Sequence, residues 1–79
     1  MENEELINLG IRIKYFRKLL NISQEKLAHK CDFDRTYISL LERGKRNPSY
    51  LNLVQLAQGL EISISKLVEE YDDAYKEVL

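Results

Sequence analysis

The sequence predicts an all-α domain, and three observations support that fold class. Apolar residues recur at spacings of three and four along most of the chain, which is the period of an amphipathic helix. Helix-capping residues stand between the apolar stretches, at Ser23, Asp34 and Ser63. No segment alternates apolar and polar residues with the period of two that a half-buried strand requires. We therefore expect helices packed around one core.

The 79 residues are enough for one domain, and no linker, repeat or low-complexity tract divides 1–79. A single cysteine excludes an internal disulfide and fits a reducing compartment. No run approaches the roughly 18 apolar residues of a membrane span. The first ten residues are acidic, where a signal peptide would be basic and then apolar. A cytoplasmic protein without a membrane partner is therefore expected.

Five helices are expected, each with its own start and stop signals. The first has Leu6, Leu9, Ile13, Phe16 and Leu20 on one face and ends at Asn21. The second is short because the turn-forming residues CDFD follow it. Gly44 is expected to end the third helix, and Gly59 the fourth. Pro48 is expected in the first turn of the fourth helix, with Asn47 or Ser49 as the capping residue. The first is expected over about 4–20, the third over 35–43 and the fifth over about 63–78, while the second begins after its cap Ser23 and the fourth ends near Gly59.

The outer face of the third helix is the first indication of function. At about 100° per residue, Ile38 and Leu41 point toward the core. The opposite side carries Thr36, Ser39, Leu40 and Arg43, and Arg35 stands at the exposed N-terminal end. Arginine, threonine and serine can bond base edges in the major groove of DNA, and leucine can contact a thymine methyl group. A solvated helix face would normally carry glutamate and lysine instead.

The charge distribution agrees with a DNA contact. The net charge is -1, but residues 1–10 carry -3, residues 11–50 carry +6 and residues 51–79 carry -4. A basic middle is the footprint of a contact with a polyanion, although an ordinary solvated surface could produce the same difference. The geometry decides between them, because a short helix, a tight turn and a second helix form a helix-turn-helix.

This arrangement assigns two kinds of DNA contact. The N-terminal part of the third helix would enter the groove and read bases, whereas its surroundings would hold the sugar-phosphate backbone. The residues expected to read bases are Arg35, Thr36, Ser39 and Leu40. The residues expected to contact the backbone are Gln24, Tyr37, Arg43, Lys45, Arg46 and Asn47.

The segment SQEKLAHKCDFDRTYISLLERGKRNPS, residues 23–49, resembles the lambda-repressor/Cro-type helix-turn-helix regulators, or Xre family. The resemblance covers most of residues 8–68. Within the family, DRTYIS, ERGKRNPS and the chain length look most like restriction–modification controller proteins. One departure is Asp32, where the family usually has glycine, and aspartate tolerates the left-handed conformation better than most residues. The matching pattern consists of Gln24, Leu27-Ala28, Ile38-Ser39, Glu42, Gly44 and Asn47-Pro48-Ser49.

The resemblance implies a homodimeric transcriptional regulator that binds a palindromic operator in double-stranded DNA, at its own promoter. It also implies a buried ion pair between Arg17 and Glu42, and the helical wheel places Glu42 near the inward side. Two copies would meet through the fourth and fifth helices, because the apolar face of the fifth outruns a domain of this size. The residues expected at this interface are Leu60, Ile62, Ile64, Leu67 and Tyr71.

Other functions are compatible with the same pattern. A phage-type or antitoxin-type repressor would share it, and a protein-only interaction module could keep the fold without binding DNA. An enzyme is disfavoured, because His29 and Cys31 stand two positions apart on a helix and point to different sides. We expect Cys31 to be a small semi-buried filler and His29 a surface residue. No metal, cofactor or small-molecule ligand is expected.

Overall fold

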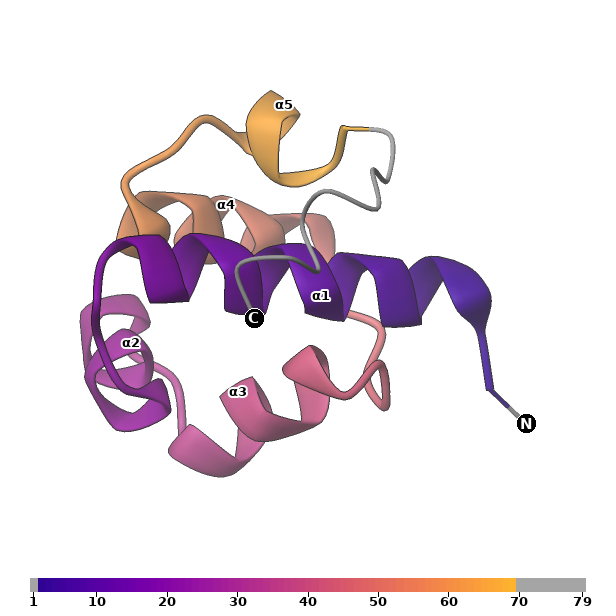
Figure 1. The fold of residues 1–79 in the computed structure, drawn as a ribbon, viewed down its shortest axis with the longest axis horizontal. Helices are drawn as coiled ribbons and strands as arrows, with labels where there is room; N and C mark the ends of the chain where they lie inside the picture. Colours follow the sequence, from indigo (N-terminus) through magenta and orange to yellow (C-terminus); the bar gives the residue numbers. More distant parts are fainter. Residues whose placement is uncertain (1, 70–79) are drawn as a thin grey trace.

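The computed structural model describes residues 2–69, and these residues are helical with short connections (Figure 1). The long helix α1 crosses the middle of the view, with α4 and α5 above it and α2 and α3 below. The expected all-α class and the order of the helices are confirmed. The helices are α1 (Glu4–Leu19), α2 (Gln24–Cys31), α3 (Arg35–Glu42), α4 (Tyr50–Leu60) and α5 (Ile64–Leu67).

Each helix begins at a polar cap whose side chain accepts a backbone hydrogen bond from the first turn. Ser23, Asp34 and Ser63 do so as expected, with Lys26, Thr36 and Lys66 as the respective donors. Of the two candidates before α4, Ser49 is the cap and accepts from the Asn52 amide. The placement of Pro48 in the first turn was therefore wrong. Pro48 precedes the cap and is buried instead.

The helix ends depend on residues in the left-handed conformation. Asn21 and Asp32 adopt it with φ of 57° and 59°, so both stop α1 and α2 as expected. Gly44, with φ of 72°, follows the last residues of α3. The expected stop at Gly59 was wrong, because α4 continues to Leu60 and Glu61 takes the left-handed position with φ of 61°. Gly59 is needed for space: a Cβ atom there would overlap the Sγ atom of Cys31 on α2.

One hydrophobic core joins all five helices. Its fully buried side chains come from each of them: Ile13, Leu27, Ile38, Leu41, Leu56, Leu60 and Leu67. Leu60 and Leu67 are only 1% and 0% exposed, so their assignment to a dimer interface was wrong. Both fill the core of their own chain and have no surface to offer a second copy. Ile62 and Ile64 are half-buried against the same core.

The C-terminal helix is shorter than expected. The apolar spacing predicted a helix over 63–78, but α5 ends at Leu67, and Val68 is its C-terminal cap. The rest of that prediction, including Tyr71, lies outside the described residues. None of the helices within residues 2–69 has the length and apolar character needed to cross a bilayer.

Candidate nucleic-acid interface

The pair α2 and α3 is arranged as two short helices joined by a three-residue turn. Asp32 adopts φ of 59° and ψ of 42°, which reverses the chain after α2. Phe33 then packs partly against the core, and Asp34 caps α3 by accepting a hydrogen bond from the Thr36 amide at 2.7 Å. Because α3 packs against both α1 and α2, its remaining side faces solvent.

The exposed side of α3 carries most of the residues expected to read bases. Ile38 and Leu41 are 0% and 1% exposed and fix the inward side, as the helical wheel predicted. Arg35 and Thr36 are exposed at the N-terminal end of the helix. Ser39 and Leu40 are half-buried, so they present less surface than the wheel alone indicates. The structure thus brings these four residues to one side, with Arg35 and Thr36 the most accessible.

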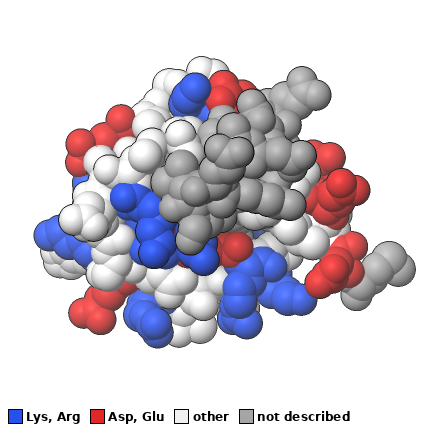
Figure 2. Space-filling view, viewed as in Figure 1, with Lys and Arg blue, Asp and Glu red and all other residues white. Residues whose placement is uncertain are grey.

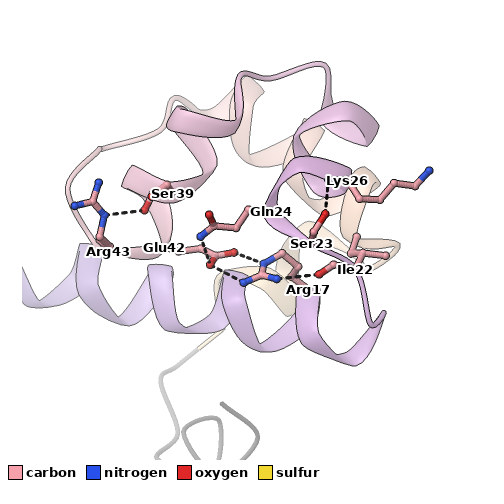
Figure 3. A network of polar contacts seen from close by, with 8 residues as sticks. All are labelled: Arg17, Ile22, Ser23, Gln24, Lys26, Ser39, Glu42 and Arg43. Atoms are coloured by element: carbon pink, nitrogen blue, oxygen red, sulfur yellow. Dashed lines mark hydrogen bonds and ion pairs between the residues drawn. The ribbon is translucent and has the colours of Figure 1, made fainter.

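The loop after α3, residues 43–49, brings further cations to the same end of the molecule. The Lys45 amide donates to the Leu40 carbonyl oxygen at 2.9 Å, which closes the helix around Gly44. The side chains of Lys45, Arg46 and Asn47 are exposed. Arg43 is exposed as well, and its Nε atom donates to the Ser39 carbonyl oxygen at 3.4 Å (Figure 3).

Tyr37 joins α3 to this loop and to α4. Its ring packs edge-on against Phe33, with centroids 5.0 Å apart, and the Arg46 guanidinium lies 5.2 Å from the ring centroid. The Asn52 amide donates to the Tyr37 hydroxyl at 2.8 Å. Asn52 was not among the residues predicted to take part in the site. A signal existed, since Asn52 is a polar residue one helical turn before the buried Leu56.

A buried carboxylate ties α1, α2 and α3 together (Figure 3). Glu42 accepts from Arg17 twice, at 2.6 and 3.0 Å, and the two side chains are only 3% and 8% exposed. This is the ion pair that the family resemblance implied. Arg17 also donates to the Ile22 carbonyl oxygen at 2.8 Å, and the Gln24 amide donates to Glu42 at 3.0 Å. The second N–H of the Gln24 amide is left for a further acceptor.

The surface charges are unevenly placed. Most lysine and arginine side chains in Figure 2 lie in the lower half of the view, on the side where Figure 1 places α2 and α3. Acidic side chains gather at the right-hand edge, toward the N-terminal end of α1. Part of this basic surface therefore lies over the two short helices, and part lies over α1.

The residues considered for catalysis do not form a site. His29 is exposed, as expected, whereas Cys31 is a core residue only 3% exposed and not the semi-buried filler that was expected. Burial of the thiol raises the pKa of Cys31 to about 11, so it is not a reactive thiolate at neutral pH. Within residues 2–69 no three histidine, cysteine or acidic side chains converge in a way that could hold a metal ion.

The short helix, left-handed turn and solvent-facing second helix define a helix-turn-helix domain. A helix-turn-helix family model matches residues 13–67. Control protein C.MunI from Mycoplasma sp is 41% identical over 71 residues, which cover 89% of this chain and 96% of that protein. Control protein C.BamHI from Bacillus amyloliquefaciens is 39% identical over 70 residues, covering 87% of this chain and 86% of the other.

Solved structures give the same result. The restriction–modification controller protein C.AhdI from Aeromonas hydrophila superimposes with a TM-score of 0.81 at 37% identity, covering 82% of this chain and 98% of that chain. The C.Esp1396I controller tetramer in complex with its natural 35 base-pair operator has a TM-score of 0.75 at 34% identity, covering 86% and 100%. The chain therefore belongs to the helix-turn-helix family, and within it to the controller proteins. The resemblance noted in the sequence is confirmed.

Proposed function

We propose that this protein is a sequence-specific DNA-binding regulator of transcription, a restriction–modification controller that acts on its own promoter as a homodimer. It binds double-stranded DNA in the cytoplasm and has no catalytic role. The controller relatives favour this circuit over a phage repressor. An immunity repressor of Bacillus phage phi105 is 38% identical over 64 residues, but this chain spans only 44% of its length.

The observation that carries the proposal is the exposed side of α3 together with the loop that follows it. Arg35 has a planar fork that matches the O6 and N7 atoms of guanine, a contact worth about 1–3 kcal/mol of discrimination between bases. Arg35 and Thr36 are exposed where a recognition helix enters the groove, and Ser39 and Leu40 follow on the same side. These four residues are proposed to read bases.

The backbone contacts are proposed to lie around that helix. Arg43, Lys45 and Arg46 supply positive charge on one rim of the groove, and Gln24 supplies an amide on the other. The Glu42 carboxylate orients the Gln24 amide, so this donor is fixed before DNA binds. Asn47 and Tyr37 are also proposed to contact the DNA backbone.

The division of roles is tested by comparing Arg35→Ala with Arg46→Ala. We expect Arg35→Ala to reduce the preference for the DNA upstream of the gene over a scrambled duplex. Arg46→Ala should weaken binding to both duplexes and make the dependence of affinity on salt shallower by about one unit. The two variants are matched, since both side chains are exposed arginines.

Two results would contradict the proposal. Equal losses for cognate and scrambled DNA in Arg35→Ala would remove its role as a base reader. No salt-dependent DNA binding by the wild-type protein would instead favour a protein-only interaction module, because phosphate contacts always release counterions.

The dimer is proposed to form through α4, α5 and the residues that follow. Tyr50 and Leu51 are consecutive residues in the first turn of α4 and are 67% and 71% exposed. Ile62 and Ile64 remain candidates, and Val68 is 46% exposed at the end of α5. Covering such apolar surface with a second copy stabilises the dimer by the hydrophobic effect.

Sedimentation velocity at micromolar concentration tests this part of the proposal. The wild-type chain should sediment near twice 9.3 kDa. Leu51→Lys should shift it toward the monomer, whereas Leu19→Lys, at a leucine 57% exposed near the end of α1, should not. A wild-type monomer at this concentration, with or without DNA, would contradict the dimer.

A further inference from the structure

A chain of three side chains runs from α4 to the DNA-facing loop. Asn52 on α4 donates to the Tyr37 hydroxyl at 2.8 Å, and the Tyr37 ring carries the Arg46 guanidinium at 5.2 Å from its centroid. Phe33 also packs edge-on against the Tyr37 ring, at 77° between the planes. The ring is therefore held by a neighbour on the turn and by a hydrogen bond from α4.

The loop itself does little to fix Arg46. The Lys45 amide is bonded to Leu40, and the Ser49 hydroxyl caps α4. Between them, within the described part of the chain, no hydrogen bond holds the backbone of residues 46–48. The direction of the exposed Arg46 side chain thus depends on the Tyr37 ring on which it lies.

Asn52 contacts the Tyr37 hydroxyl through its side chain alone. Its backbone amide is occupied by the Ser49 cap, whereas its side-chain amide reaches Tyr37. The residue is half-buried on the inward side of α4, where an apolar side chain would be ordinary. An amide at such a place requires a partner, and the Tyr37 hydroxyl is that partner.

We propose that Asn52 is a positioning residue for DNA binding: it fixes Tyr37, and Tyr37 in turn holds Arg46 in the direction from which it meets the DNA backbone. The inference rests on the proposed function and adds to it a residue on a helix outside the helix-turn-helix pair. Arg46 would be partly ordered before DNA arrives. The entropy lost on immobilising a long side chain at the interface is then smaller.

This mechanism predicts a particular pattern of affinity and salt dependence. Without Asn52 the arginine still reaches phosphate, but it has to be ordered on binding. Asn52→Ala should weaken DNA binding about two- to tenfold, the range expected for ordering one such side chain. The salt dependence should stay that of the wild type, because the same number of counterions is released. Arg46→Ala, by contrast, should make the slope of log affinity against log salt concentration shallower by about one unit.

The test is a pair of double-mutant cycles on a duplex made from the DNA directly upstream of the gene. Affinity is measured at several salt concentrations for the wild type, Asn52→Ala, Tyr37→Phe, Arg46→Ala and the doubles that combine Asn52→Ala with each of the other two. Gln58→Ala, at an exposed residue of the same helix, is the control and should bind like the wild type. Thermal melting of each variant monitors folding.

We expect Asn52→Ala to lose most of its effect when Tyr37→Phe or Arg46→Ala is already present, because all three act through one chain of contacts. Additive losses in either cycle would overturn the inference while leaving the proposed function intact. No binding of this duplex by the wild type would instead count against the proposed function itself. If Asn52→Ala fails to fold, the cycle of Tyr37→Phe with Arg46→Ala tests the same link with Asn52 in place, and additivity there overturns it.

Discussion

Replacing Glu42 with glutamine removes a buried charge without changing the shape of the side chain. Breaking one partner of a buried pair costs about 3–5 kcal/mol, because the other charge is left uncompensated. Arg17 would keep its hydrogen bond to the Ile22 carbonyl oxygen and could still donate to the oxygen of the new amide. We therefore expect a loss at the lower end of this range. A loss of about 3 kcal/mol lowers the melting temperature of a domain this size by about 12–24 °C.

Circular dichroism during heating measures this difference, and Glu61→Gln is the matched control. Glu61 also pairs with a cation, Lys30 at 2.5 Å, but its side chain is 63% exposed. An exposed pair contributes only about 0–1 kcal/mol, so the control should lose a few degrees at most. Adding Arg17→Met to Glu42→Gln removes the stranded charge and should recover part of the loss. Equal melting temperatures for Glu42→Gln and Glu61→Gln would refute the reasoning.

Two further predictions concern Cys31. Gly59→Ala should lower the free energy of unfolding by about 1–3 kcal/mol, since the new methyl group overlaps the Cys31 sulfur. Adding Cys31→Ala should restore most of the lost free energy of unfolding, measured by urea titration. An unchanged loss in the double variant would contradict the steric cause. Because burial raises the pKa of the Cys31 thiol from 9.0 to about 11, its contribution to stability is complete below pH 9 and is lost as the pH rises toward 11. Stability measured at pH 8 and 10.5 should therefore fall less for Cys31→Ala than for the wild type, whereas parallel profiles would argue against this.

The first three helices could be predicted from the sequence because their signals are local. A capping side chain accepts a bond from two or three residues away, as Ser23 and Asp34 do. A left-handed residue such as Asp32 is recognised by its own side-chain type. The inward side of α3 follows from helical geometry alone, so Ile38 and Leu41 were placed correctly.

Several of the failures concern contacts between distant parts of the chain, unlike the local misplacement of Pro48. Gly59 reads as a helix stop, but its lack of a side chain makes room for Cys31, 28 residues earlier in the sequence. Leu60 and Leu67 belong to an apolar stripe that periodicity cannot assign to one core or to a shared interface. The pairing of Asn52 with Tyr37 likewise depends on where the first turn of α4 lies relative to α3, which no local pattern encodes.

The division of α3 into two sides has a consequence for how such regulators diverge. The residues that dock the helix, Ile38, Leu41 and Glu42, are buried farther along it, whereas Arg35 and Thr36 are exposed at its N-terminal end. Substitutions at the two exposed positions therefore change the solvent-facing surface of α3 without disturbing its contacts with the rest of the domain. Ser39 and Leu40 are half-buried and tolerate a narrower range of sizes. With the base-reading roles proposed above, new operator preferences would be engineered by exchanging Arg35 and Thr36 first on an otherwise unchanged scaffold.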